Sequence, residues 1–327
     1  MISPHTTSIV FPVQPTQVAQ VIPFAQLLQR RGSGRLWLGQ SLGVETHHVF
    51  AALAGAGMRI PFGTSVALAG LRHPYDAAVQ ARSVAQLSGL PFVAGIGPGG
   101  EAFQRMVRTA PMPKPVTVSG QYLTTMRELI ESRSGADSDG LEHSTHGALP
   151  VMDTPPVELG LGVLRPAMAR AAGRVADVAI TWLTPPRFIE EALVPALEQG
   201  AAQAERPVPR VATVVHVAVR RPGRDIEAIA HSAAYAHLGS PHYTDMLRQA
   251  GVPADPADTK GGAALLVSSG TFVAGTPDEI ADGLDRYRAA GVGEVILNVC
   301  GVYTALGMGA AMTDMQQILA AVDGRHA

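Results

Sequence analysis

The 327-residue chain has a single cysteine, Cys300, so it can form no internal disulfide and no paired-cysteine metal site. Aromatic residues make up only 5% of the sequence, and the formal net charge is -2. The longest basic cluster is the pair Arg30 and Arg31, which argues against a nucleic acid or an anionic membrane as partner. Small molecules are therefore the expected partners.

The sequence also lacks targeting and metal-binding signals. No apolar run approaches the roughly 20 residues that cross a bilayer, and residues 1–13 lack the basic and apolar segments of a signal peptide. We therefore expect a cytoplasmic protein, in agreement with the single cysteine. The neighbouring histidines, His47 with His48 and His143 with His146, have no carboxylate or cysteine at metal spacing, so we predict no metal.

Apolar residues are plentiful, at 46% of the chain, and short β-branched runs alternate with longer amphipathic stretches. This alternation predicts strands at residues 8–13, 35–39, 60–69, 91–96, 157–161, 175–182, 210–219 and 293–299, with helices between them and a last helix at 312–322. Eight strands that are apolar on both faces favour a (β/α)8 TIM barrel, formed by residues 1–327 as one domain. A dinucleotide-binding fold is disfavoured because no glycine follows the first strand directly after Val13.

Two segments interrupt the alternation and predict insertion loops. Residues 132–150 are rich in Ser, Gly and Asp, which predicts a long exposed loop. Residues 225–269 are helical in pattern but are broken at 239–241 and 251–258. Variable loops of this kind would select the substrate, whose identity they do not reveal.

The active site of such a barrel forms at the carboxyl ends of the strands. After the fourth expected strand, residues 95–101 read GIGPGGE, whose glycines let a ligand approach the backbone and whose following helix offers free amides. Glycine-rich turns also occur for steric reasons alone. Glu101 has two interpretations, a general acid or a carboxylate that caps the helix start.

Three further positions at strand ends could contact a ligand. Residues 160–166, GLGVLRP, combine glycines, a proline at a helix start and Arg165, which suits a phosphate, although a tight crossover with a surface arginine is the alternative. Gly63 within the third strand indicates a bulge or a close ligand. Trp37 and Trp182 lie near strand ends, where each could stack on a planar ring or pack in the core.

Three blocks of sequence resemble the bacterial-luciferase-like oxidoreductases, a family of flavin- and deazaflavin-dependent enzymes. Residues 63–100 resemble the third and fourth βα units of that family, including Arg72-His73-Pro74 at a helix start and the GxGPGG turn. Residues 166–182 resemble the helix and strand that follow its phosphate-binding turn, and residues 275–292 resemble its penultimate helix.

The resemblance implies a bound deazaflavin, coenzyme F420, or alternatively flavin mononucleotide (FMN). It also implies a non-prolyl cis peptide bond between Ser65 and Val66, behind the ring. The phosphate of the cofactor would lie on the amides of the turn before Arg165. The cofactor-binding residues that we expect are Gly63, Ser65, Val66, Gly97, Gly99, Gly162, Val163, Leu164, Arg165 and Trp182.

The sequence departs from the family at one informative place. Deazaflavin-dependent dehydrogenases commonly carry an Asp-His pair after the second strand, and the matching positions here are Gln40 and Ser41. Without that base, the chain is better suited to delivering hydride than to oxidising an alcohol. By similarity, we expect Gln40, Ser41 and Glu101 near the ring as catalytic residues.

The expected function is therefore that of a reductase that uses reduced coenzyme F420. Its acceptor would be a C=C or C=N bond of a small molecule, or a dehydroamino acid in a natural-product peptide. One alternative is a monooxygenase that uses reduced FMN and O2, and another is a non-catalytic family member without a cofactor. The resemblance also implies a homodimer that pairs through the helices of the second and third βα units.

Overall fold

The structure, a computed structural model, describes residues 6–107, 110–133 and 147–325. Most of the expected loop at 132–150, with His143 and His146, lies outside the described residues. The chain forms two compact units, which we describe separately. The terminal unit comprises Met1–Val13, Thr181–Pro195 and Val211–Ala327, and the central unit comprises Gln14–Ile180 and Ala196–Arg210.

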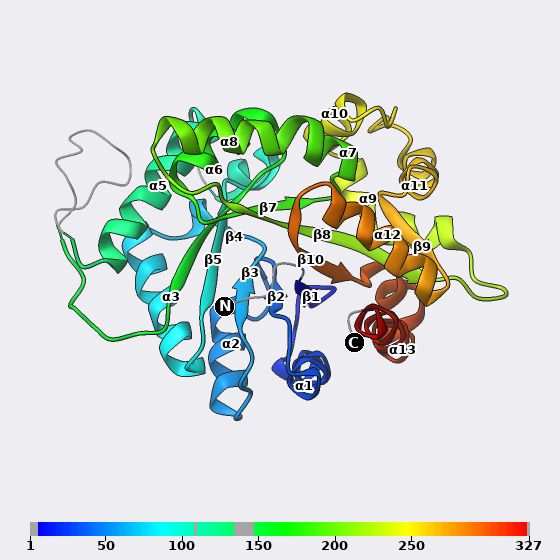
Figure 1. The fold of residues 1–327 in the computed structure, drawn as a ribbon, viewed down its shortest axis with the longest axis horizontal. Helices are drawn as coiled ribbons and strands as arrows, with labels where there is room; N and C mark the ends of the chain where they lie inside the picture. Colours follow the sequence, from blue (N-terminus) through cyan, green and yellow to red (C-terminus); the bar gives the residue numbers. More distant parts are fainter. Residues whose placement is uncertain (1–5, 108–109, 134–146, 326–327) are drawn as a thin grey trace. The chain divides into compact units, whose positions relative to one another are not determined.

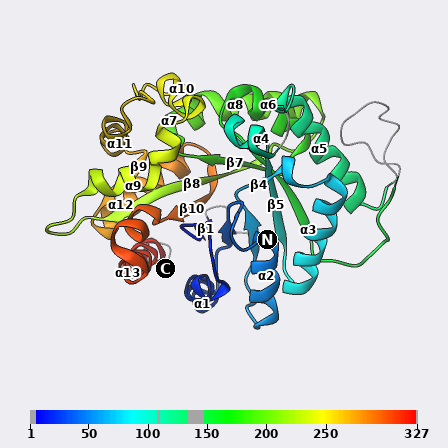
Figure 2. The same ribbon diagram turned by 180° about the vertical axis from the view of Figure 1, so that it is seen from behind.

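Strands and helices alternate along the chain (Figures 1 and 2). The strands are β1 (Thr6–Val10), β2 (Leu36–Leu38), β3 (Phe62–Thr64), β4 (Ala67–Leu68), β5 (Phe92–Gly97), β6 (Val157–Gly162), β7 (Val178–Trp182), β8 (Arg210–Val219), β9 (Phe272–Gly275) and β10 (Val292–Asn298). The first helices are η1 (Val18–Gln20), α1 (Ile22–Arg31), α2 (Thr46–Gly55), η2 (Ala69–Leu71), α3 (Pro74–Ser88), α4 (Glu101–Val107), α5 (Pro115–Ile130) and α6 (Pro166–Val175). The later helices are α7 (Pro186–Phe188), η3 (Ile189–Leu193), α8 (Val194–Gln203), α9 (Ile226–Leu238), α10 (Pro241–Gln249), α11 (Thr259–Ser268), α12 (Pro277–Ala289) and α13 (Cys300–Gly324).

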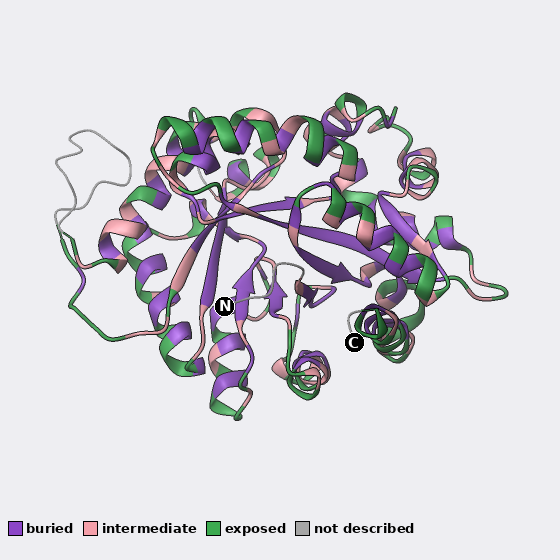
Figure 3. Ribbon diagram, viewed as in Figure 1, coloured by how far each residue is buried: buried purple, intermediate pink, exposed green. Residues whose placement is uncertain are grey.

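The strands of the central unit are all parallel to their neighbours. β2 pairs with β3, β3 with β5, β5 with β6, and β6 with β7, while the short β4 also pairs with β5. Helices α2, α3, α5 and α6 pack in sequence beside one another (Figures 1 and 2). The strands are buried almost throughout, whereas these helices expose their outer faces (Figure 3). Strands covered on both faces need apolar residues at every position, which explains their unbroken apolar sequences.

Local sequence signals fix the helix ends. His73 caps α3 by accepting a hydrogen bond from the backbone of Tyr75, and the helix ends at Gly89, whose φ of 69° suits glycine. Thr276 and Glu279 form a capping box at the start of α12. The segments around Pro74 and Pro277 therefore mark helix starts, as the sequence predicted.

The terminal unit contains a second set of parallel strands, with β1 paired to β10 and β8 paired to both β10 and β9. The long strand β8 pairs with β10 along its first part and with β9 along its last part. His216 lies where the two pairings meet, opposite both Phe272 and Asn298. The carboxylate of the buried Asp314 on α13 accepts hydrogen bonds from the backbone of Val219 and from two arginine side chains, which ties α13 to the end of β8.

All eight expected strands are present, but the sequence prediction was wrong in three details. The third strand is divided into β3 and β4, and the four-residue strand β9 was not predicted. The last helix begins at Cys300, not at 312, because glycines obscured its first half and Gly307 breaks it with a φ of 84°. Within the described residues, no helix has the length and apolarity needed to cross a membrane.

Candidate active site

The peptide bond between Ser65 and Val66 is cis, as the resemblance implied. It lies between β3 and β4, directly after the carboxyl end of β3 and within the third expected strand. The amide of Ser65 donates to the carbonyl of Leu38 at 2.9 Å, and the amide of Gln40 donates to the carbonyl of Val66 at 3.0 Å. The segment is therefore fixed to the end of β2 on both sides of the cis bond.

Gln40 and Ser41 hold this region together through hydrogen bonds. Gln40 Oε1 accepts from the amide of Leu68 at 3.3 Å, and its Nε2 donates to the carbonyl of Ser41 at 3.0 Å. Ser41 is buried, and its Oγ accepts from the amide of Gly43 at 3.2 Å. Neither side chain is a base at neutral pH, so both are placed to position the loop, and their catalytic roles remain predictions.

Two glycines at neighbouring strand ends leave room for the side chain of Val66. A Cβ added to Gly97, at the end of β5, would lie 2.6 Å from Val66 Cγ2. A Cβ added to Gly162, at the end of β6, would lie 3.4 Å from Val66 Cγ1. Around Val66, these two strand ends therefore present backbone in place of side chains. We call Ser65, Val66, Gly97 and Gly162 the backbone cradle.

The backbone cradle contains one buried polar atom without a partner. Ser65 is 7% exposed, and its Oγ makes no hydrogen bond. Buried hydroxyls are nearly always hydrogen-bonded to protein, water or a ligand. A glycine-lined cradle with one unsatisfied hydroxyl fits a flat ring that has polar atoms on its edge, such as a flavin or a deazaflavin.

The turn after β6 agrees with only part of the expected phosphate site. The amide of Val163 donates to the carbonyl of Ile180 at 2.7 Å, so strand pairing already occupies it. Gly162 closes β6, Leu164 follows in the turn, and Arg165 precedes the first residue of α6. The phosphate-binding role of these residues remains a prediction. The amide of Val163 is the group least available to a phosphate, because it already donates to Ile180.

Glu101, Gly99 and Gly63 lie in three different settings. Glu101 is exposed in the first turn of α4 and forms an ion pair with Arg105, which favours the capping interpretation over general acid chemistry. Gly99 has a φ of 75°, which the turn after β5 requires. A Cβ on Gly63 would lie 2.8 Å from the ring of Trp37, so this glycine makes room for a buried tryptophan within the core.

Sequence reasoning named Trp182, whose cofactor-binding role stays a prediction, but missed the histidine rings that lie against it in the terminal unit. Trp182, at the end of β7, meets the edge of His216 at a centroid distance of 5.4 Å and stacks on His237 at 5.5 Å. We call these three residues the imidazole–indole cluster. Positions 182, 216 and 237 follow no recognisable spacing. The available signal was the single histidine within the otherwise apolar strand 210–219.

Both imidazoles of the cluster are uncharged at neutral pH. His216 is 1% exposed, and burial together with the neighbouring His237 lowers the pKa of His216 to about 3. Burial together with His242 lowers the pKa of His237 to about 4. Within the cluster, Nδ1 and Nε2 of His216, Nε1 of Trp182 and Nδ1 of His237 have no hydrogen-bond partner.

Comparison with known proteins identifies the family. A family model described as luciferase-like monooxygenase matches residues 4–294, which is most of the chain. The chain belongs to the luciferase-like monooxygenase family. The resemblance read from the sequence is thereby confirmed.

Solved structures similar to this luciferase-like chain include enzymes with two kinds of cofactor. A coenzyme F420-dependent tetrahydromethanopterin reductase from Methanopyrus kandleri is 20% identical, with a TM-score of 0.71 over 98% of this chain and 99% of that one. An F420-dependent secondary alcohol dehydrogenase is 17% identical, with a TM-score of 0.70 over 98% and 99%. A type II Baeyer-Villiger monooxygenase of Pseudomonas putida, in complex with FMN, is 16% identical, with a TM-score of 0.68 over 97% of each chain. These likenesses confirm the fold, a (β/α)8 barrel.

Two loops beside the backbone cradle of this luciferase-like protein are joined by an ion pair. Glu45 caps α2 by accepting from the amides of His47 and His48, and its Oε1 lies 3.0 Å from Nη2 of Arg72. Burial opposes ionisation of Glu45, but the hydrogen bonds and charges of His47 and Arg72 lower its pKa to about 2. The hydroxyl of Tyr122 donates to the carbonyl of Arg72 at 3.1 Å and fixes the second loop to α5.

We expect Glu45 to make folding stability fall in acid. Because its pKa is lower in the folded chain than the value of about 4.3 in an unfolded one, its contribution is complete above that unfolded value. The contribution is lost as the pH falls from there towards 2. Urea unfolding between pH 6 and pH 3 should show a smaller loss of stability for Glu45→Gln than for the wild type. Glu191→Gln, in an exposed pair with Arg187, is the control and should follow the wild type; parallel curves for all three proteins would contradict the assignment.

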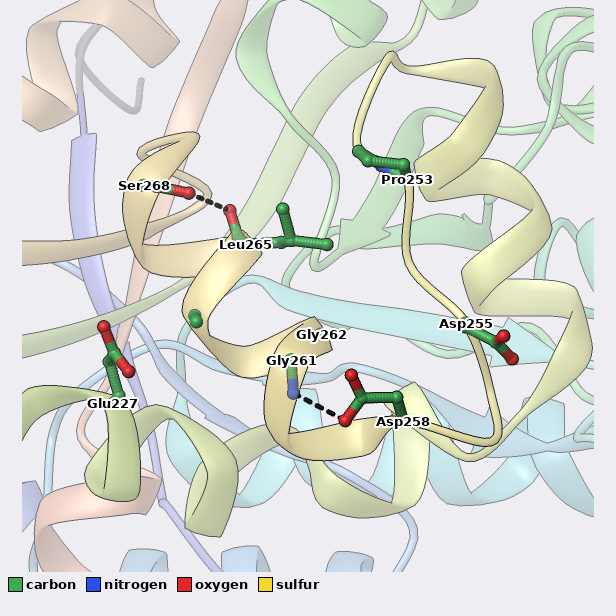
Figure 4. A pocket seen from close by; sticks show the side chains of 9 residues that line it. Glu227, Pro253, Asp255, Asp258, Gly261, Gly262, Leu265 and Ser268 are labelled. Atoms are coloured by element: carbon green, nitrogen blue, oxygen red, sulfur yellow. Dashed lines mark hydrogen bonds between the residues drawn. The ribbon is translucent and has the colours of Figure 1, made fainter.

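The luciferase-like chain also has a surface pocket of about 430 Å³ in the terminal unit, between α9 and α11. Figure 4 shows Glu227, Asp255 and Asp258 at its edge. Asp258 caps α11 by accepting from the amide of Gly261, and Asp255 accepts from the amide of Ala257, so local backbone uses both carboxylates. In the part of the chain that the structure describes, no three His, Cys, Asp or Glu residues are grouped to hold a metal ion.

Proposed function

We propose that this protein is an oxidoreductase that uses reduced coenzyme F420 to reduce a C=C or C=N bond. The acceptor would be a small molecule or a natural-product peptide, for example one with a dehydroamino acid. The observation that carries the proposal is the backbone cradle, with the unsatisfied hydroxyl of Ser65, in a chain of the luciferase-like family. When bound, the deazaflavin would supply the hydride, and the cradle would hold its ring.

The residues after β2 favour reduction over alcohol oxidation. Oxidising an alcohol requires a base that removes the hydroxyl proton. Gln40 and Ser41, which stand where related dehydrogenases carry an Asp-His pair, hold the backbone through hydrogen bonds and cannot serve as that base. The similar structures include both a reductase and an alcohol dehydrogenase, so the preference for reduction rests on Gln40 and Ser41.

The second candidate is an FMN-dependent monooxygenase that uses O2. The backbone cradle suits either ring, and one similar structure is a Baeyer-Villiger monooxygenase with FMN. A member without a cofactor is less consistent with the cradle, because the buried hydroxyl of Ser65 has no hydrogen-bond partner without a ligand.

Titration of the purified protein with F420 and, separately, with FMN tests the proposal through quenching of ligand fluorescence. Tight binding of F420 alone, followed by anaerobic reduction of an N-acyl dehydroamino acid, would support the reductase. Preference for FMN with substrate-dependent O2 consumption would support the monooxygenase. If neither ligand binds, both enzymatic candidates are contradicted.

We also propose a homodimer that pairs through α3. Leu71, Tyr75, Val79 and Leu87 form an exposed apolar stripe on this helix and the turn before it. Light scattering after gel filtration should give the mass of a dimer, and Val79→Glu should shift it to a monomer because a buried charge is costly. Val208→Glu changes another exposed valine and should leave the dimer intact. A monomeric wild type would contradict the proposal.

A further inference from the structure

The imidazole–indole cluster collects buried polar atoms that the proposed reduction does not use. Four nitrogens on Trp182, His216 and His237 lack hydrogen-bond partners, and His216 is almost completely buried. More than nine in ten buried polar groups are hydrogen-bonded in folded proteins, so four unsatisfied nitrogens on three touching rings point to a ligand. The three residues come from β7, β8 and α9, so separate elements converge on this place.

The neighbouring rings define the shape of the group that would fit. Phe272 stacks on His216 at a centroid distance of 6.3 Å with planes 18° apart. Tyr243 meets His237 edge to face at 4.8 Å. Aromatic surroundings of this kind favour a planar group that contacts the rings and reaches the nitrogens with its polar edge.

The protonation state defines the chemistry of that group. His216 is neutral at neutral pH, so its ring has one N–H donor and one acceptor nitrogen, while the indole of Trp182 is a donor only. A neutral imidazole offers no charge to a carboxylate or a phosphate. The complementary group is uncharged and carries a carbonyl acceptor beside an N–H donor.

We propose that the imidazole–indole cluster binds an amide or imide group of the form C(=O)–NH. The carbonyl oxygen would accept from Nε1 of Trp182, and the N–H would donate to the acceptor nitrogen of His216. Such a group occurs in the proposed substrate, as the amide beside its dehydroamino acid. The carboxyl-terminal parts of β7 and β8 are where barrels of this class bind ligands. The proposal extends the proposed function by naming the chemical class recognised.

Nuclear magnetic resonance of protein labelled with ¹⁵N in tryptophan tests the proposal directly. The chain has two tryptophans, so the spectrum has two indole N–H signals, and Trp182→Phe assigns them. Trp37, which is fully buried in the central unit, is the internal control. FMN and F420 are added first, and N-acetyldehydroalanine N-methylamide is then added with and without the cofactor.

We expect the Trp182 signal to move downfield while the Trp37 signal stays in place. Movement with the dehydroalanine amide supports the proposal, whereas movement with FMN or F420 alone would make the cofactor the occupant and overturn it. If none of these compounds moves the Trp182 signal, the cluster binds water only and the proposal is overturned.

The variant His216→Phe distinguishes a binding role from a structural one. Phenylalanine keeps a flat ring but removes both unsatisfied nitrogens, so the ligand-free variant should be as resistant to urea as the wild type, or more so. The affinity of whichever compound moves the Trp182 signal should fall on the order of tenfold for each hydrogen bond lost. His48→Phe, at an exposed position, is the control. Lower stability with unchanged affinity would overturn the proposal.

The same experiments separate this proposal from the proposed function. If the fluorescence of neither F420 nor FMN is quenched, yet the dehydroalanine amide moves the Trp182 signal, the redox function fails and the amide site stands. If the fluorescence of a cofactor is quenched, while no compound moves the Trp182 signal, the redox function stands and the amide site fails.

Discussion

Replacing Gly97 with alanine is expected to lower the affinity for the cofactor roughly 5- to 150-fold, because overpacking of this kind costs about 1–3 kcal/mol. The new methyl group would lie 2.6 Å from Cγ2 of Val66, so the valine side chain must turn away. In the ligand-free protein, the half-buried Val66 can turn towards the space that a bound ring would use. The cost should therefore appear when the ring binds, and fluorescence titration with F420 and FMN measures it.

Gly120→Ala is the matched control for this experiment. Gly120 lies on α5 with nothing within 4 Å of its added Cβ, so alanine there should leave the affinity unchanged. Thermal unfolding of both variants shows whether each protein remains folded. If Gly97→Ala binds the cofactor as tightly as the wild type, the backbone cradle is not the cofactor site.

Replacing Asp314 with asparagine is expected to destabilise the protein by about 3–5 kcal/mol, the usual cost of breaking a buried ion pair. Asp314 is fully buried and accepts from Arg224 at 2.6 Å, from Arg221 at 3.1 Å and from the amide of Val219 at 3.0 Å. Asparagine keeps the size but removes the charge, which leaves the nearly buried guanidinium of Arg224 without its counterion. Urea unfolding followed by circular dichroism measures the loss.

The control for Asp314 is an exposed carboxylate in the same unit. Asp282 is 71% exposed and pairs with Arg325 at 2.6 Å. Because exposed pairs contribute between 0 and about 1 kcal/mol, Asp282→Asn should change stability little. Equal effects of the two substitutions would show that the Asp314 network does not anchor α13.

The fold was predictable because its signals are local. Each barrel strand is a short apolar run, and prolines and glycines mark the helix boundaries, as Pro74 and Gly89 do for α3. Strand β9 escaped prediction because its four residues, FVAG, are too few to show alternation and two of them are small. The start of α13 was hidden because Gly301 and Gly307 lower its helix propensity, while contacts with the rest of the terminal unit hold it in place.

The candidate site was only half predictable, for a different reason. Resemblance located the cis bond at Ser65 and Val66 and the glycine turns, because these features follow one another along the sequence. Trp182 and His216 lie on strands that α7, η3 and α8 separate along the chain, so no sequence spacing records their contact. For Gly63, only the structure shows that Trp37 fills the space beside it, and its role in cofactor binding stays a prediction.

The pairing of β8 has a consequence for synthesis of the protein on the ribosome. Within the terminal unit, β8 pairs with β9 and β10, and both leave the ribosome after it. Three helices separate β8 from β9 along the chain, and four separate it from β10. Until residues 272–298 emerge, the backbone N–H and C=O groups of β8 that pair with β9 and β10 have no partners. These groups belong to a largely apolar strand of ten residues. Unpaired strand edges of this kind promote aggregation, so the nascent chain has a vulnerable interval that ends when β10 is made.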